Sequence, residues 1–261
     1  MIDMELELNI EKPPLKRLLV WFSAGATSAV AAAVALKANA GRLETRVLYC
    51  ETGNHHEDNL RFLREVSEWI GHRIETVRNL RYRDVDGVIE KERYLNGPDG
   101  AKCTQQLKIR VRKELQNVAT DLQVFGFHAG EIDRAGDFRY NWPEVRLSCP
   151  LIERNLFHAD CLAMVREAGI EVPMLYRMGY KNNNCIGCVK GGKGYWNKVR
   201  VDFPSVFLKR AKQERAIGHS CIKGTFLDEL DPAAGKYQAE PDIACEGHCV
   251  SARIELEACG V

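Results

Sequence analysis

Ten cysteines are the side chains with the most evident chemistry in this chain of 261 residues. Cys185 and Cys188 are separated by two residues, a spacing that suits a zinc knuckle, half of an iron–sulfur site or a redox-active dithiol. Cys221, Cys245 and Cys249 follow and offer further sulfur ligands. These spacings are unlike those of a secreted disulfide scaffold, which a chain of this length does not need. The cysteines therefore indicate metal or redox chemistry in a reducing compartment.

Several other cysteines have no partner at ligand spacing. A free cysteine is among the residue types most often buried, and it packs like a small apolar side chain. We therefore expect four of them to take no part in the chemistry: Cys50, Cys149, Cys161 and Cys259.

A second chemically suggestive stretch covers residues 23–28, with the sequence SAGATS. The apolar run 18–22 precedes it and the alanine-rich run 29–37 follows it, which predicts a buried parallel strand and then a helix. The first N–H groups of a helix lack intrahelical partners and, with the helix dipole, form an anion site. Small side chains would let a phosphate approach this backbone, and the three hydroxyls could donate hydrogen bonds. An ordinary strand-to-helix turn remains the alternative.

The elements that must position these residues alternate along the chain. Further strands are expected over 45–50, 74–77 and 122–127, and helices over 57–70, 105–115, 156–168 and 204–217. Residues 79–101 are charged and contain glycines, so we expect an irregular excursion or lid there. This alternation predicts an α/β fold with a mainly parallel sheet and helices on both faces. Ligands of such sheets bind beyond the carboxyl ends of the strands, where segments 23–28, 51–53 and 129–134 fall.

We expect two regions, an α/β domain over 1–180 and a Cys- and Gly-rich region over 181–261 packed on it. In the second region the only clear helical pattern is 204–217. Lysine plus arginine (37) nearly balance aspartate plus glutamate (36), so the total charge favours neither nucleic acid nor a membrane as partner. Residues 1–14 are acidic and amphipathic rather than a signal peptide, and 24–36 is too short to span a bilayer. These features predict a cytoplasmic protein.

The loop resembles the PP-loop of the adenine nucleotide alpha-hydrolase-like superfamily, whose pattern is roughly S-G-G-x-D-S. Here Ala24 replaces the first glycine and Thr27 replaces the acid that ATP-consuming members use. The resemblance implies a Rossmann-like fold and an adenine nucleotide as ligand. The implied nucleotide-binding residues of the loop are Ser23, Ala24, Gly25, Ala26, Thr27 and Ser28.

Downstream segments resemble the PAPS reductase-like branch of this superfamily, in order over roughly residues 17–190. The matching segments are Glu51-Thr52-Gly53, Lys102-Cys103-Thr104-Gln105-Gln106-Leu107-Lys108, Gly126 through Glu131 to Arg134, Pro150-Leu151-Ile152, and residues 173–180 before the CxxC pair. The resemblance implies that Lys102, Lys108 and Arg134 bind a phosphosulfate or triphosphate, with Lys108 and Arg134 also acting in catalysis. It further implies that Glu51 orients a ribose, a water molecule or Mg²⁺, while Thr52, Gly53, Gly126 and Glu131 border the nucleotide. Arg110, Arg112 and Lys113 are expected to form a solvated helix face.

Several members of this branch bind a 4Fe-4S cluster beside the nucleotide, through a cysteine before the conserved lysine and a CxxC pair. The resemblance implies Cys103, Cys185 and Cys188 as ligands, with zinc as the alternative metal. Cys245 and Cys249 are the candidates for the fourth position. Because Cys245 best matches the nucleophilic cysteine at the end of true reductases, and one thiol cannot freely serve both roles, we assign Cys245 to catalysis and Cys249 to the metal.

Three functions remain open at this point. The first is sulfonucleotide reduction or sulfur transfer on PAPS, APS or a related adenylate, with a thioredoxin-like reductant. The second is a PP-loop ATP pyrophosphatase that activates an acceptor, including a nucleic acid, for thiolation. The third is a non-catalytic, nucleotide-binding accessory subunit of a phage or CRISPR-like defence system. Nucleic acid, a ribonucleoprotein complex and a second copy of this chain in a homodimer are the candidate macromolecular partners. In the basic segment 190–200, Tyr195 and Trp196 could stack on nucleic acid bases, or the segment could cover a cluster.

Overall fold

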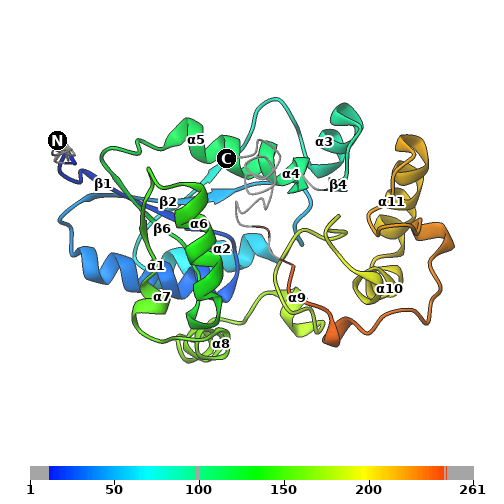
Figure 1. The fold of residues 1–261 in the computed structure, drawn as a ribbon. Coiled ribbons are helices and arrows are strands. Elements are labelled where there is room, and N and C mark those ends of the chain that lie inside the picture. The colour runs from blue at the N-terminus through cyan, green and yellow to red at the C-terminus, as the bar shows by residue number, and fades with distance from the viewer. Residues whose placement is uncertain (1–11, 98–99, 244, 246–261) are drawn as a thin grey trace, which may run out of the picture.

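The computed structural model describes residues 12–97, 100–243 and 245. A five-stranded sheet with the order β3-β2-β1-β6-β7 forms its centre, and every neighbouring pair is parallel (Figure 1). The strands are β1 (Arg17–Phe22), β2 (Glu44–Cys50), β3 (Ile74–Val77), β6 (Asp121–Val124) and β7 (Arg146–Ser148). The predicted α/β class with a parallel sheet is therefore confirmed.

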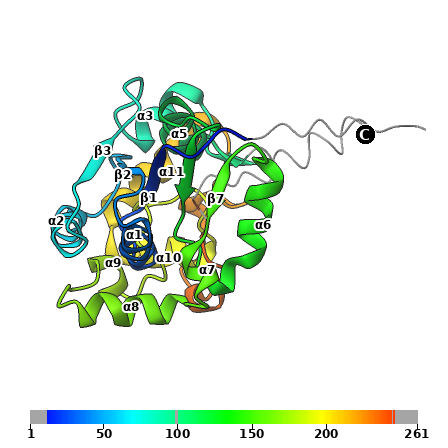
Figure 2. The ribbon, with the colours of Figure 1, turned by 90° about the vertical axis from the view of Figure 1, so that its left-hand side faces the viewer.

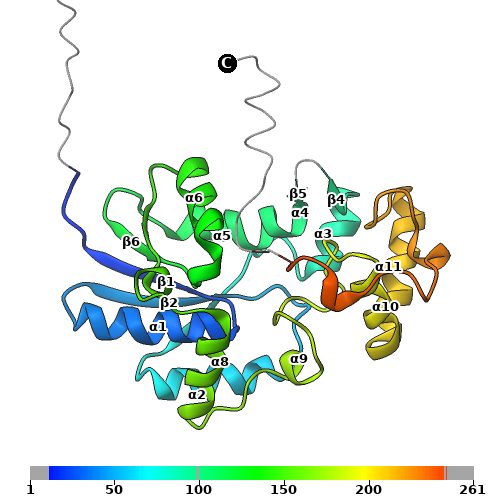
Figure 3. The ribbon, with the colours of Figure 1, turned by 60° about the horizontal axis from the view of Figure 1, so that its bottom comes forward.

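Helices cover both faces of this sheet (Figure 3). On one face lie α1 (Ala26–Asn39), α2 (Asn59–Trp69) and α8 (His158–Glu167), and on the other α5 (Arg110–Leu115) and α6 (Ile132–Asn141). Figure 2, which views the sheet nearly end-on, places α2 and α6 on opposite sides of the molecule. In β1, Leu18 and Val20 belong to the first core and Leu19 and Trp21 to the second. Burial on both faces explains why this strand is continuously apolar.

Some expected boundaries shift. Helix α1 begins at Ala26 rather than residue 29, and β6 ends at Val124 rather than residue 127. The expected excursion over 79–101 contains α3 (Val85–Glu92) and, next to it, a short hairpin of β4 (Asn96–Gly97) and β5 (Gly100–Ala101). The Asp84 side chain caps α3 by accepting a bond from the Gly87 N–H at 2.7 Å. The irregular interpretation of this segment is therefore wrong for α3, because a cap and a buried apolar face stabilise the helix.

The expected basic helix over 105–115 is confirmed and starts earlier. It runs through α4 (Lys102–Thr104), a π-helical turn η1 (Gln105–Ile109) and α5. The expected solvated face is wrong for Arg112, which is only 4% exposed because its guanidinium lies between the rings of Phe138 and Trp142. A π-helical turn shifts the side chains that follow it by a fraction of a turn, and such turns are frequent at functional sites.

The C-terminal part lies beyond the carboxyl ends of the strands (Figures 1 and 3). Two short helices precede it, α7 (Pro150–Glu153) and α9 (Met174–Arg177). The C-terminal part itself contains the helices α10 (Lys193–Asp202) and α11 (Pro204–Ile217) and the turns η3 (Leu227–Glu229) and η4 (Tyr237–Ala239). A core of its own joins these elements. The expectation of a single helix here is wrong, because α10 also forms. Among the described residues, no helix has both the length and the apolar character needed to cross a membrane.

The aromatic residues of α10 are fully part of that core. Tyr195 is 4% exposed and Trp196 is 0% exposed, and Trp196 packs on Phe207 of α11. Neither ring could stack on a nucleic acid base without leaving the core. The stacking interpretation of segment 190–200 is therefore wrong for both residues, because helical periodicity turns them inward.

Candidate functional site

The loop at residues 23–28 connects the end of β1 to the start of α1. The first hydrogen bond of the helix runs from the Ala29 N–H to the Gly25 carbonyl at 3.1 Å, so the N–H groups of residues 26–28 precede the helical ladder. Ala24 has φ of 59°, in the left-handed region that favours glycine. The loop therefore keeps a glycine-like backbone although alanine occupies the position.

The three hydroxyls of the loop have different surroundings. Ser28 is fully buried, donates to the Gly25 carbonyl at 2.9 Å and accepts from the Ser23 N–H at 3.1 Å. Ser23 and Thr27 instead line a cavity. The expectation that all three hydroxyls face a ligand is wrong for Ser28, whose hydroxyl closes the loop on itself.

Gly126, just after β6, lies against this loop. A Cβ atom added to it would come within 2.9 Å of both the Cα and N atoms of Ser28. Backbone therefore packs directly on backbone here, as glycine alone allows. This contact fixes the loop against the neighbouring strand end, where sequence analysis expected the two segments to converge.

A polar cavity, with an empty volume of about 540 Å³ that includes open solvent, lies beside the loop. Its wall contains seven residues singled out from the sequence: Ser23, Gly25, Thr27, Gly126, Glu131, Arg134 and Cys245. These come from three segments far apart in the chain. The structure thus gathers one set of the predicted residues around a single space.

Within the polar cavity, Arg134 forms an ion pair with Glu131. Glu131 also accepts a hydrogen bond from the His128 N–H at 3.1 Å. The Arg134 guanidinium is therefore held in place by the carboxylate of Glu131, at the start of the same helix, and this carboxylate offsets its charge. An anion in this cavity would meet a neutral pair rather than a lone cation.

Sequence analysis missed several other residues of this wall. Asn183 is 6% exposed and donates to the Ala24 carbonyl at 2.7 Å and to Asn59 Oδ1 at 2.8 Å. His158, Tyr176 and Asp242 also line the cavity. Single polar residues scattered over distant segments carry no spacing signal, so only the fold could reveal them.

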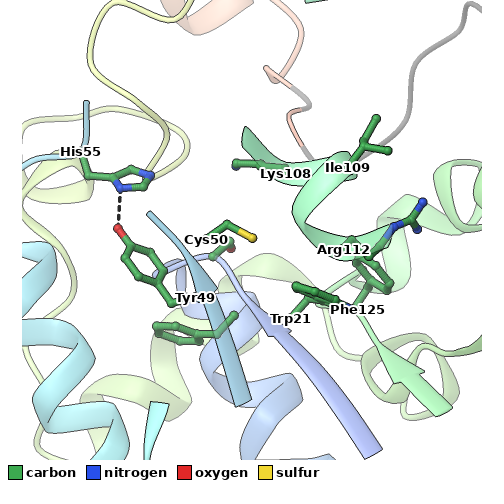
Figure 4. A pocket seen from close by; sticks show the side chains of 10 residues that line it. Trp21, Tyr49, Cys50, His55, Lys108, Ile109, Arg112 and Phe125 are labelled. Carbon is green, nitrogen blue, oxygen red and sulfur yellow. Dashed lines mark hydrogen bonds between the residues drawn. The ribbon is translucent and has the colours of Figure 1, made fainter. Parts of the chain in front are cut away.

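Ser23 also lines a second, aromatic cavity. Figure 4 shows the side chains around this second cavity. Trp21 and Phe125 form part of its wall, with ring centroids 6.5 Å apart. Lys108 and His55 bring polar ends to the same space. Lys108 therefore faces a cavity as expected, whereas Lys102 lines neither of the two and lies over the Tyr94 ring at 5.5 Å.

The acid-Thr-Gly tract follows β2 and holds a histidine. Glu51 lies 3.3 Å from His55 Nδ1 and accepts from the Gly53 N–H at 2.6 Å. These bonds, with that to His55 the strongest, lower the pKa of Glu51 to about 2. Gly53 has φ of +74°, and a Cβ there would lie 2.4 Å from that of Asp84. Glu51 therefore serves first to fix His55, and it lines neither cavity.

The cysteines predicted as ligands gather near the end of β2. The Cys185 sulfur lies 3.0 Å from the Thr52 hydroxyl, and Cys245 lies 3.6 Å from that of Thr104. Burial, with smaller contributions from the nearby thiols of Cys245 and Cys185, raises the pKa of the Cys103 thiol to about 12. Burial also raises the pKa of Cys188, with contributions from the same three thiols.

Four thiols thus lie within electrostatic range of one another. Even so, no group of three or more His, Cys, Asp or Glu side chains within the described ranges converges closely enough to hold a single metal ion. Cys249 and Cys259 lie outside the described residues. Three of the expected spectators are buried, as predicted: Cys50, Cys149 and Cys161.

Residues 17–191, more than half of the chain, match the family model for the phosphoadenosine phosphosulfate reductase domain. The chain belongs to this family. Among curated proteins, none matches. Among solved structures, the chain is similar to phosphoadenylyl-sulfate (PAPS) reductase from Candida auris in its phosphate complex, with 15% identity and a TM-score of 0.45 over 64% of this chain and 80% of that one.

Helix α10, which follows the segment matched by the PAPS reductase model, positions the CxxC pair. The Tyr195 hydroxyl accepts from the Cys188 N–H at 2.9 Å and donates to the Cys185 carbonyl at 3.3 Å. Arg210 of α11 is 1% exposed and donates to the Gly187 carbonyl between the two cysteines at 3.4 Å. The part of the chain after the matched segment therefore supports the predicted ligand loop.

Proposed function

We propose that this member of the family binds an adenine nucleotide across both cavities and acts in sulfonucleotide reduction or sulfur transfer. The observation that carries the proposal is that Ser23 lines both the aromatic and the polar cavity. A nucleotide needs this arrangement, because an aromatic base is joined to an anionic chain. The base would lie against Trp21 and Phe125, and the anionic groups would lie along the loop.

Each half of the site has the chemistry that its part of the ligand requires. Aromatic walls bind a base through stacking and apolar contact. The N–H groups at the start of α1 and the Ser23 and Thr27 hydroxyls favour an anion. Lys108 lies in the aromatic cavity and adds a cation close to the junction.

Cys245 is the proposed nucleophile, because it lines the polar cavity beside the loop. Its thiolate would attack the sulfur of a phosphosulfate, forming an S–S bond while the bond from sulfur to the phosphate oxygen breaks. The nucleoside phosphate leaves with that electron pair, and Cys245 retains the sulfonate. A thioredoxin-like dithiol would then displace sulfite and become the disulfide.

Four thiols within electrostatic range of one another offer ligands for an iron–sulfur cluster, which we propose here, with zinc as the alternative. In a cubane cluster each thiolate binds a different iron, so the sulfurs stand apart around a larger body. Cys103, Cys185 and Cys188 would hold such a cluster, with Cys249 as the proposed fourth ligand; when bound, it would supply electrostatic or redox support next to the nucleotide.

Metal content tests the ligand assignment. The full chain would be purified without oxygen and analysed for iron, sulfide and zinc, together with Cys103→Ser, Cys185→Ser and the control Cys161→Ser. We expect about four irons per chain, lost in the first two variants and kept in the control, since Cys161 is buried in the core under α1 and is not one of the gathered thiols. One zinc and no iron would contradict the cluster.

Turnover tests the reaction. We expect sulfite release from adenosine 5′-phosphosulfate or its 3′-phosphorylated form with thioredoxin, lost in Cys245→Ser while nucleotide binding persists. Mg²⁺-dependent pyrophosphate release from ATP would instead identify an ATP pyrophosphatase. Binding without any turnover would identify an accessory subunit.

A further inference from the structure

Two histidines face each other in the polar cavity. His128 precedes the turn η2 (Ala129–Glu131), and His158 is the first residue of α8. Their ring centroids are 6.0 Å apart, and the Tyr176 ring lies 5.6 Å beyond His158. All three residues line the cavity that begins at Ser23 and Thr27. The anion-binding loop therefore opens directly onto a row of imidazole and phenol rings.

The ring nitrogens of His128 and His158 differ in their hydrogen bonds. His128 Nδ1 accepts a hydrogen bond from the Gly130 N–H at 3.1 Å, so in the neutral ring the proton resides on Nε2. His158 Nε2 is buried and has no hydrogen-bond partner among the residues that the structure describes. A buried polar atom without a partner is costly, which points to a ligand group that would pair with it.

The charged side chains around His128 and His158 provide no net positive charge to balance a bound anion. The other ionisable side chains of the cavity are Glu131, Arg134, Tyr176, Asp242 and Cys245. Arg134 is already paired with Glu131, and Asp242 adds a negative charge. Burial lowers the pKa of both histidines, and for His128 the neighbouring charges of His158 and Arg134 lower it further, whereas Asp242 opposes this. The empty cavity therefore keeps both rings neutral at pH 7 and has no surplus of positive charge.

We propose that His128 and His158 contact the anionic end of the nucleotide and take up a proton when it binds, so that affinity for an anion of fixed charge increases as the solution becomes more acidic. This inference rests on the proposed function, because it concerns the same cavity. It adds His128 and His158 to the residues that bind the nucleotide, and it predicts that nucleotide affinity depends on pH. An arginine in place of the pair would stay charged throughout and would give no such response.

The direction follows from linkage. A bound anion favours the charged imidazolium, so each histidine has a higher pKa in the complex than in the empty cavity. Affinity is then greatest below the pKa of the empty cavity and falls as the pH rises through the pKa of the complex. Uptake of one proton changes the dissociation constant by about tenfold per pH unit within this window.

The test uses adenosine 5′-phosphosulfate as the probe, because its phosphate and sulfate groups carry the same charge at every pH in the experiment. Calorimetric titration between about pH 5.5 and about pH 8.5 should show at least tenfold tighter binding at the acidic end. The variants are His158→Phe, which keeps a ring on Tyr176, and His128→Asn, which keeps a cap acceptor for Gly130. His72→Gln, at a histidine outside the cavity, is the matched control.

We expect the double variant to bind with little pH dependence and the control to keep the full dependence. A double variant with the wild-type slope would overturn the inference while leaving the proposed function standing. Absence of binding by the wild type at every pH would overturn both. If the variants fail to fold, proton uptake by the wild type on binding is measured in two buffers of different ionisation enthalpy. Proton uptake would support the inference, and the absence of proton uptake would overturn it.

Discussion

The hydroxyl of Thr52 lies 3.0 Å from the sulfur of Cys185, although 133 positions separate the two residues. The same hydroxyl lies 3.1 Å from His55 Nε2. Nearby, the Ile186 N–H donates to the Asn54 carbonyl at 2.8 Å. The CxxC segment is therefore bound to the carboxyl end of β2, the strand next to β1 and its loop at residues 23–28.

Thr52→Val should destabilise the metal-free protein, since Thr52 is 2% exposed and its hydroxyl contacts both His55 and Cys185. Loss of the hydroxyl leaves them without this contact, at a cost of about 1–3 kcal/mol. Urea unfolding would measure the change. Thr76→Val, at an exposed position of β3, is the control and should change little. Equal stability of the two variants would show that the Thr52 contact contributes nothing.

Gly126→Ala should disrupt the anion loop, because the new Cβ would lie 2.9 Å from backbone atoms of Ser28. Backbone cannot yield as a flexible side chain can, so we expect both weaker nucleotide binding and a lower melting temperature. Gly25→Ala is the matched variant, since its Cβ would meet only the Tyr176 hydroxyl at 3.2 Å and Ser23 Oγ at 3.6 Å. It should fold nearly as well as the wild type. Equal effects of the two variants would argue against the close contact.

Arg112→Met should leave the free energy of unfolding unchanged or raise it. Burial lowers the pKa of Arg112 to about 10, so the group stays charged at pH 7. Its three guanidinium nitrogens have no hydrogen-bond partner within the described part of the chain. Replacing an unpaired buried charge by an apolar side chain is often neutral or stabilising, even though the contacts with Phe138 and Trp142 are lost.

Arg17→Met provides the contrast for Arg112→Met. Arg17 binds Asp121 through two hydrogen bonds, of 3.0 and 2.7 Å, and the Asp121 side chain is 1% exposed. Removal of the arginine leaves a buried carboxylate unpaired, at a cost of about 3 kcal/mol. Guanidinium chloride unfolding should therefore show a clear loss of stability for Arg17→Met and no loss for Arg112→Met. A large loss from Arg112→Met would indicate that this guanidinium is stabilising after all.

Asp86→Asn should weaken the attachment of α11 to α3, because Asp86 pairs with Lys209 at 2.6 Å and with Arg210 at 3.1 Å. Burial acts to raise the pKa of Asp86, but these cations outweigh it and hold the pKa below 3.8. The pair therefore stabilises the fold fully above that value, and its contribution disappears as the pH falls below it.

Stability measured against pH would check this prediction. Near neutral pH the loss in Asp86→Asn should be about 3 kcal/mol, because Arg210 is buried and would lose its carboxylate. The loss should shrink in acid below pH 3.8. Asp137→Asn, at an exposed position of α6, should show neither effect. A penalty for Asp86→Asn that stays constant down to low pH would contradict the pairing.

The sequence determined the parts of this protein that depend on local pattern. The apolar run of β1 and the small-residue turn before α1 predicted the buried central strand and the loop at its end. The alternation of strands and helices predicted the α/β class, since each element carries its own periodicity. Membership in the PAPS reductase family follows from motifs in the same segments.

Tertiary structure decided what local pattern does not contain. Arg112 belongs to a basic helix, yet it is buried because the rings of Phe138 and Trp142 cover it. Trp196 lies in a basic segment, yet it is buried in a core that also contains Phe207 and Leu227. The same holds for the site, where His158 and Asp242 carry no motif and lie in one cavity with Ser23. Packing places such residues together through contacts between segments far apart in the chain. Spacing along the chain constrains only neighbours, so this gathering became visible in the folded protein alone.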